Sequence, residues 1–147
     1  SKETASDTAS TETAMIEFCE SINYDFDVFC LLQATSPFTR KEDINACLIK
    51  LKEDYDSALT VVNTHRFLWD KDGNALNYKP EERPRRQDFE GLLIENGAVY
   101  AVTKQALKKH KNRIGEKIAV VKIMRALIII VTKKSCIRIT LFLIGAE

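Results

Sequence analysis

The feature that most constrains the fold is a strand, a loop, a helix and a second strand that follow one another within residues 27–64. Residues 27–32 form a short apolar run, typical of a strand buried on both faces. A polar loop with a proline (33–37) comes next, and residues 40–53 repeat apolar side chains at helical spacing. Residues 57–64 then look like a second strand. A helical crossover between two strands predicts a parallel sheet and an α/β fold.

Local signals predict where the helices begin. The pattern T-x-x-E from Thr39 to Glu42 predicts a capping box in front of the helix at 40–53. An earlier helix is expected over residues 8–22, because its apolar residues fall on one stripe. Asp7 or Ser6 is the expected N-cap of that helix.

The second half of the chain is predicted to leave the sheet and return to it. Asp72-Gly73 is a tight-turn signal that predicts a hairpin within 67–78, and the charged stretch 79–88 is predicted to be loop. The further expected elements are a strand at 98–102 opened by Gly97, a helix at 104–110 and a strand at 117–123. We therefore predict an α/β fold with a mostly parallel sheet, helices on its faces and a hairpin excursion.

Composition excludes several protein classes. The chain has 147 residues, about one domain, with 45% hydrophobic and 29% charged residues. These values exclude a disordered chain, a collagen-like repeat and a strongly basic nucleic-acid coat protein. The net charge is +1, but residues 101–147 hold eleven bases and two acids, which gives +9. Aromatic residues do not interleave with these bases, so we expect no nucleic-acid partner, and a basic nucleic-acid patch is a minor alternative.

The cysteines and the chain start indicate a cytoplasmic protein. The four cysteines form no C-x-x-C pair, so we expect reduced, buried thiols rather than a zinc site. The start Ser-Lys-Glu-Thr has no features of a secretory signal. The apolar run 118–131 is interrupted by Lys122 and Arg125, so we expect no membrane segment. His65 and His110 share no metal-binding motif.

Three clusters could carry chemistry. The loop from Gln33 to Pro37 offers an amide and two hydroxyls at the carboxyl end of a strand, where α/β sheets bind ligands. The basic cluster ends in Arg86-Gln87, whose guanidinium could hold a carboxylate or a phosphate. The third cluster runs from Glu95 to Tyr100 and includes Asn96-Gly97. Each has a simpler reading: a helix-capping loop, a solvated charged loop, and a turn followed by a core tyrosine.

The text and order of these clusters resemble one enzyme family. LLQATSP at 31–37 resembles the LLQPTSP segment of the acylneuraminate cytidylyltransferases, or CMP-sialic acid synthetases. RRQD at 85–88 and IENGAVY at 94–100 resemble that family's arginine–glutamine motif and its NGAIY strand. ASDTAS at 5–10 resembles the segment before the family's central helix. The resemblance covers about residues 3–125.

The resemblance implies a reaction, a fold and roles for residues. Such enzymes transfer the cytidylyl group of CTP to the anomeric hydroxyl of an acidic nine-carbon sugar, with Mg²⁺ as cofactor, and release pyrophosphate. The implied fold is Rossmann-like, of the nucleotide-sugar-transferase type, with a protruding dimerisation element and a homodimer as its assembly. The implied sugar contacts are Gln33, Arg86, Gln87, Asn96 and Tyr100, and the implied nucleotide contacts are Ala9 and Thr11.

The sequence also departs from the family. Nothing here resembles the basic loop R-x-x-S-K-x-x-x-K-N that holds the CTP phosphates, so the fold is expected to be incomplete. Ala34 replaces the usual proline. The aspartates of S-I-D-I-D, expected after the strand 117–123, are missing, so no metal ligand and no catalytic residue is assigned. We therefore divide the chain into 1–127, the central and C-terminal part of a cytidylyltransferase domain, and an atypical tail, 128–147.

Two alternatives stay open on this basis. The sugar could be legionaminic or pseudaminic acid, since both are carboxylated nine-carbon sugars, whereas Kdo fits less well. The chain could also be a non-catalytic remnant that binds sugar weakly or dimerises. Impaired activity of the chain by itself is the expectation under the leading interpretation.

Overall fold

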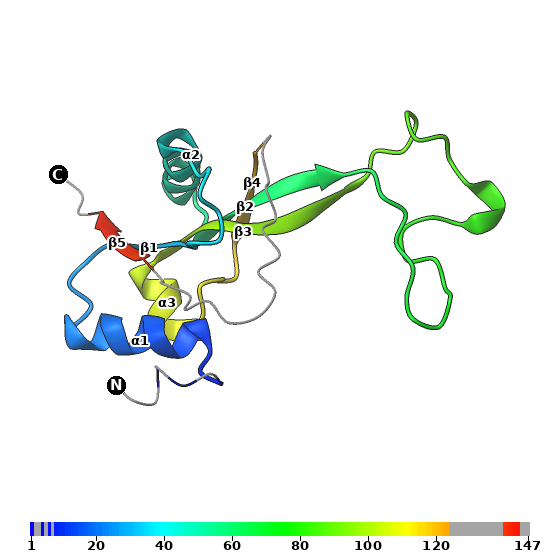
Figure 1. The fold of residues 1–147 in the computed structure, drawn as a ribbon. Helices are drawn as coiled ribbons and strands as arrows, with labels where there is room; N and C mark the ends of the chain where they lie inside the picture. The colour runs from blue at the N-terminus through cyan, green and yellow to red at the C-terminus, as the bar shows by residue number, and fades with distance from the viewer. Residues whose placement is uncertain (2–3, 5, 7, 124–139, 145–147) are drawn as a thin grey trace.

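The computed structural model describes residues 1, 4, 6, 8–123 and 140–144. Figure 1 shows one open sheet with helices against it. The elements are α1 (Thr11–Ser21), β1 (Val28–Leu32), α2 (Lys41–Leu51), β2 (Ser57–Thr64), the 3₁₀ helix η1 (Pro80–Glu82), β3 (Leu92–Thr103), α3 (Lys104–His110), β4 (Ile118–Lys122) and β5 (Thr140–Ile144). The strands lie in the order β4-β2-β3-β1-β5. The α/β class predicted from the sequence is confirmed.

The pairing of the strands differs from the simplest expectation. β1, β2 and β4 run in one direction, as the predicted helical crossover requires. β3, however, lies between β1 and β2 and is antiparallel to both, so β2 and β4 form the only parallel pair among the described strands. The reason is that the chain leaves β2 through a long excursion and returns as β3, and a returning strand pairs antiparallel with the strand it follows.

The sheet separates two apolar layers. One layer is packed by α1 and α3, with buried Met15 and Leu107 against Phe29 and Leu31 of β1. The other is packed by α2, whose Cys47 lies with Cys30 and the small side chains of the strands. Strand β1 is buried on both faces, as its apolar run predicts.

The N-terminal caps of α1 and α2 differ from those predicted from the sequence. The N-cap of α1 is Ser10, whose hydroxyl accepts a hydrogen bond from Thr13 N at 3.1 Å, and not Asp7 or Ser6. At α2 the T-x-x-E pattern is not used. The helix begins one residue later, and the Arg40 backbone N–H donates to Asp43 Oδ2 at 3.0 Å. Thr39 instead donates its hydroxyl to the Ser36 carbonyl in the preceding turn, at 2.8 Å.

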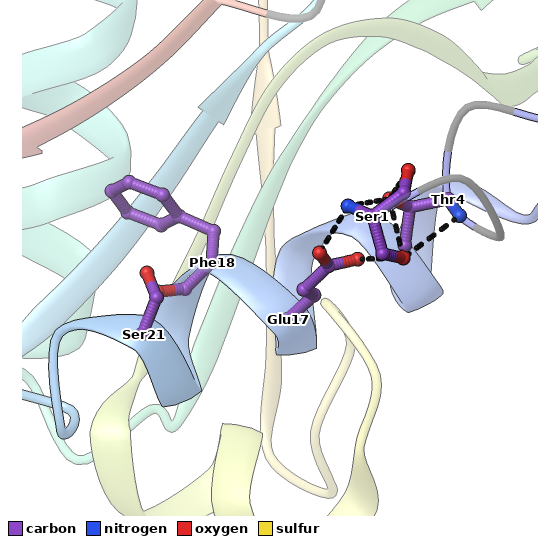
Figure 2. A network of polar contacts seen from close by, with 5 residues as sticks. All are labelled: Ser1, Thr4, Glu17, Phe18 and Ser21. Carbon is purple, nitrogen blue, oxygen red and sulfur yellow. Dashed lines mark hydrogen bonds and ion pairs between the residues drawn. The ribbon is translucent and has the colours of Figure 1, made fainter.

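Polar contacts along α1 are drawn in Figure 2. The Glu17 carboxylate accepts hydrogen bonds from the Ser1 amino group and, at 2.9 Å, from the Ser1 hydroxyl. The hydrogen bond from the amino group is the main reason that the pKa of Glu17 falls to about 2. At the other end of the helix, the Ser21 hydroxyl donates to the Phe18 carbonyl at 2.7 Å. These contacts are exposed and leave the buried face of α1 free to pack on the sheet.

β2 and β3 continue beyond the sheet and carry residues 65–91, which we call the arm. Figure 1 shows the arm as the long green loops at the far end of the β2–β3 ribbon. The predicted hairpin is present, because Trp69 and Ala75 form an antiparallel bridge around the turn at Gly73. The arm has its own aromatic cluster, in which the Phe67 ring lies 4.4 Å from Tyr78 and 5.2 Å from Phe89.

The end of the chain is described only in part. Of the tail predicted to be atypical, 128–147, the structure describes β5, which pairs antiparallel with β1. Residues 124–139 and 145–147, which include the segment where the family has its metal-binding aspartates, lie outside the described residues. Within the described part, no helix is long and apolar enough to cross a membrane.

Candidate substrate-binding site

Two of the predicted clusters meet at the carboxyl end of β1. The Gln33 backbone N–H donates to the Ala98 carbonyl at 3.3 Å, which continues the pairing of β1 with β3. Gly97 has φ +69°, and a Cβ placed there would lie 2.6 Å from Gln33 Oε1. The side chain of Gln33 therefore lies against the bare backbone of Gly97, an approach that a larger residue would obstruct.

Asn96 occupies an irregularity within β3 rather than a turn before it. The β2–β3 register shifts between Leu59 and Val61, and Thr60 fills the gap. Thr60 donates its hydroxyl to Asn96 Oδ1 at 2.7 Å and accepts from Val99 N at 3.0 Å. Ala98 N also donates to Asn96 Oδ1, at 3.2 Å. The carbonyl of the Asn96 side chain is thus fixed, which leaves its amide NH₂ available as a donor.

Tyr100 lies on β3, four residues after Asn96, and faces the layer formed by α1 and α3. It pairs with Leu31 of β1 and is 3% exposed, so the simpler reading as a core tyrosine describes its ring. Its hydroxyl nevertheless has a polar partner, since it donates to the carboxylate of the exposed Glu95. Burial, together with this carboxylate, raises the pKa of Tyr100, so the phenol is a neutral donor at physiological pH.

An arginine that the sequence reasoning did not single out contacts the same tyrosine. The guanidinium of Arg113 lies 4.6 Å from the centre of the Tyr100 ring. Its Nε lies 3.1 Å from Glu12 Oε1 in the first turn of α1. Glu12 and Tyr100 are far apart in sequence, so no local pattern signals that Arg113 joins them. The contacts of Arg113 with Glu12 and Tyr100 are seen only in the three-dimensional structure.

The residues implied for the nucleotide lie at the start of α1. Ala9 N donates to the Ser6 carbonyl at 3.1 Å in the turn before the helix, and Thr11 is the first helical residue. Glu12 follows directly and reaches Arg113. The candidate nucleotide segment and the candidate sugar residue Tyr100 are therefore connected through one guanidinium.

Arg86 and Gln87 are not brought together with the other candidates. Both are exposed on the arm, where they line an open groove with Arg66, His65 and the end of β2. Figure 1 shows that the loops of the arm lie away from the sheet that carries Gln33 and Tyr100. Within a single copy of the chain, the predicted sugar site is thus divided between the sheet and the arm.

The described residues do not form a metal centre. Among them no group of three or more His, Cys, Asp or Glu side chains could hold an ion. The segment that the resemblance implies for Mg²⁺ follows Ile123 and lies outside the described residues. The residues in view do not fit the cofactor, and no chemical step is assigned to it.

Three cysteines are buried and free, as predicted from their sequence context; Cys136 lies outside the described residues. Burial raises the pKa of the Cys30 thiol to about 11 and that of the Cys47 thiol to about 12. Protonated thiols are poor nucleophiles, so neither of these two is suited to covalent catalysis.

The chain is similar to known cytidylyltransferases in sequence. It is 33% identical over 123 residues to N-acylneuraminate cytidylyltransferase B of Danio rerio, a match that covers 78% of this chain and 29% of that protein. It is 34% identical over 117 residues to N-acylneuraminate cytidylyltransferase A of the same fish, and 35% identical over 117 residues to the Oncorhynchus mykiss enzyme. Each of these two matches covers 74% of this chain and 27% of the relative. No protein-family model matches the sequence.

A solved structure shows the same fold. The chain superposes on 4-diphosphocytidyl-2C-methyl-D-erythritol synthase from Anaerococcus prevotii with a TM-score of 0.56, over 78% of this chain and 57% of that one. The two sequences are 13% identical, so this likeness concerns the fold alone. The matches confirm the resemblance to the acylneuraminate cytidylyltransferases, over a chain that spans 27–29% of the length of those relatives.

Proposed function

We propose that this chain, a relative of the acylneuraminate cytidylyltransferases, forms the part of such an enzyme that binds the acidic sugar. In the complete reaction, the anomeric hydroxyl attacks the α-phosphorus of CTP. A new P–O bond forms, the bond to pyrophosphate breaks, and the hydroxyl proton passes to solvent or a base. Positioning and electrostatic stabilisation carry most of the catalysis of such a transfer.

The observation that supports the proposal is the meeting of Gln33 with the segment from Asn96 to Tyr100. Gln33 and Asn96 are more than sixty positions apart in sequence, yet the β1–β3 pairing brings their segments together at the carboxyl end of β1. Together they offer amide donors and acceptors and, through Tyr100 and Glu95, a paired hydroxyl and carboxylate. Such groups suit a polyol, whose hydroxyls both donate and accept.

Arg86 and Gln87 complete the proposed site through a second copy of the chain. Their exposed position on the arm separates them from Gln33 in one copy. In a homodimer the arm of one copy would extend to the sheet of the other, where Arg86 would face the sugar carboxylate. The exposed Trp69 and Leu76 of the arm, 50% and 62% exposed, are apolar surface that such an assembly would cover.

Calorimetric titration of the chain with N-acetylneuraminate tests the proposal. We expect saturable binding that Gln33→Ala weakens by about tenfold, the effect of about one lost hydrogen bond. Gln105→Ala is the matched control, since Gln105 is an exposed glutamine on α3 and should leave the affinity unchanged. Absence of heat with the wild-type chain, or equal affinities of the two variants, would contradict the proposal.

Two parallel titrations address the alternatives. Legionaminic and pseudaminic acids, tried in place of N-acetylneuraminate, would identify the sugar by the tighter binding. Titration with CTP and Mg²⁺ addresses the non-catalytic reading. Metal-dependent binding of CTP would exclude a remnant without nucleotide function. The Mg²⁺ cofactor and a cytoplasmic location stay predictions.

A further inference from the structure

We propose that Arg113 is a positioning residue of this site, which orients Tyr100 and ties it to the first turn of α1. The inference rests on the proposed function for the role of the site, but the contacts stand independently of it. The guanidinium covers the Tyr100 ring at 4.6 Å and pairs with Glu12 at 3.1 Å. It therefore joins β3, α1 and the loop between α3 and β4.

The surroundings of Arg113 are unusual for a merely structural ion pair. Its side chain is 21% exposed and that of Glu12 is 26% exposed, so both charges are largely withdrawn from water. Within the described residues, Arg113 Nη1 is a buried side-chain nitrogen without a hydrogen-bond partner. An unsatisfied buried donor costs about 1–3 kcal/mol. Such departures from full satisfaction are expected at functional sites, where geometry takes precedence over stability.

The contacts explain what the guanidinium orients. A cation over the face of Tyr100 restricts the ring, and the ring in turn directs the hydroxyl at Glu95. Glu12 holds the other side of the guanidinium and lies next to Thr11. The chain of contacts thus runs from the segment implied for the nucleotide to the residue implied for the sugar, with Arg113 at its centre.

Chemical nitration of tyrosine by tetranitromethane, followed by peptide mapping, tests the orientation without any ligand. Tyr100 should be protected in the wild-type chain, whereas Tyr55, 39% exposed, should react. Arg113→Met should raise the nitration rate of Tyr100 by about tenfold, as expected for the loss of one desolvated cation–π contact. Arg113→Lys, which keeps the charge, should restore most of the protection. Unchanged protection of Tyr100 in Arg113→Met would overturn the proposal.

A matched control separates positioning from general loosening. Lys109 pairs with Glu116 at 2.7 Å on the surface, and Lys109→Met removes a cation of similar length from the neighbouring element. We expect Lys109→Met to leave the Tyr100 rate unchanged, and thermal unfolding of each variant to show that the chain is folded. If Lys109→Met exposed Tyr100 as strongly as Arg113→Met, the specific role of Arg113 would be refuted.

Titration with N-acetylneuraminate extends the test to function. Arg113→Met should weaken binding by about tenfold in the wild-type background and should have little effect in Tyr100→Phe, because the hydroxyl it orients is then absent. Additive losses in the double variant would refute action through Tyr100. If the wild-type chain bound no sugar, the proposed function would fail, while the nitration rates would still decide whether Arg113 positions Tyr100.

Discussion

The sheet and the arm of this chain are stabilised in different ways. In the sheet, β1 is covered on both faces, and Phe29 and Leu31 are almost fully buried between helices and strands. In the arm, the Phe67 ring packs against Tyr78 and Phe89, and Trp69 is half exposed. Thus the sheet is a continuous core, whereas the arm is a small satellite cluster. The candidate site is divided across the same boundary, so its two parts depend on different stabilising contacts.

The largest effect is expected from a substitution in the core of the sheet. Phe29→Ala should lower the free energy of unfolding by about 3–5 kcal/mol, because it leaves a cavity in the packed core. Unfolding by urea, followed by circular dichroism, measures the effect. Phe38→Ala is the control, since Phe38 is 61% exposed and should change stability by no more than about 0.5 kcal/mol. Similar losses in the two variants would show that the core assignment is wrong.

A carboxylate at the start of β2 should have the next largest effect. Asp56 accepts from Glu116 N at 2.9 Å and Lys117 N at 3.0 Å, which join β2 to the chain before β4. Asp56→Ala leaves these donors without their partner and should cost about 2 kcal/mol. Comparison with Asp54→Ala, an exposed aspartate nearby, isolates the effect. Equal stability of the two variants would contradict this role.

The same carboxylate predicts a pH dependence. Burial opposes ionisation of Asp56, but the hydrogen bonds from Glu116 N, Lys117 N and Ser57 outweigh it and lower the pKa below 3.8. A group with a lowered folded-state pKa stabilises the fold above its unfolded pKa, and that stability is lost as the pH falls through the folded value. The difference in stability between wild type and Asp56→Ala should therefore shrink in acid. A constant difference down to low pH would contradict the assigned contacts.

At the boundary between the two regions, Gly97→Ala should be mildly destabilising and should disturb the site. Its φ of +69° disfavours alanine by about 1–2 kcal/mol, and the added Cβ would displace the amide of Gln33. Gly73→Ala is the control, since Gly73 also has a positive φ but has open space around it. Both should lose similar stability, and only Gly97→Ala should weaken binding of N-acetylneuraminate. Equal binding by the two variants would argue against Gln33 as a sugar contact.

The smallest effect is expected within the arm. Phe67→Ala removes aromatic contacts worth about 0.5–1.5 kcal/mol, and the loss should be confined to the arm. Limited proteolysis should then cut residues 65–91 faster, while the urea midpoint of the sheet stays close to that of wild type. A large shift of that midpoint would show that the arm and the sheet unfold together, against the comparison drawn above.

Local patterns predicted the helices and strands well, but they did not predict which strands lie next to each other in the sheet. The strand at 57–64 agrees with β2, and the helical spacing of Ile44, Cys47 and Leu48 gives α2 to within two residues. The insertion of β3 between β1 and β2 was not predicted, because no local signal states which strand a returning segment joins. The Asn-Gly pair was interpreted as a turn before a strand. Instead it lies within one, since Thr60 of β2 stabilises the irregular backbone.

Only those candidate site residues that lie within a sequence motif could be predicted from the sequence. Gln33 and Asn96 were identified from text that resembles one family, and the structure brings their segments together. Arg113, in contrast, has no motif, and its partners Glu12 and Tyr100 lie on separate elements. The separation of Arg86 from Gln33 was also beyond sequence reasoning, because spacing along the chain gives no distance between the arm and the sheet.

The central position of β3 has a consequence for how the chain folds. β1 and β2 do not pair with each other, so each must wait for β3, which ends at Thr103. During synthesis the first two strands emerge well before the strand that joins them, with unpaired backbone groups and apolar faces exposed to solvent. Long-range pairing of this kind slows folding and leaves unpaired strands open to association with other chains. Ribosome-bound chains that stop before residue 92 should therefore depend on chaperones more strongly than chains that extend past residue 103.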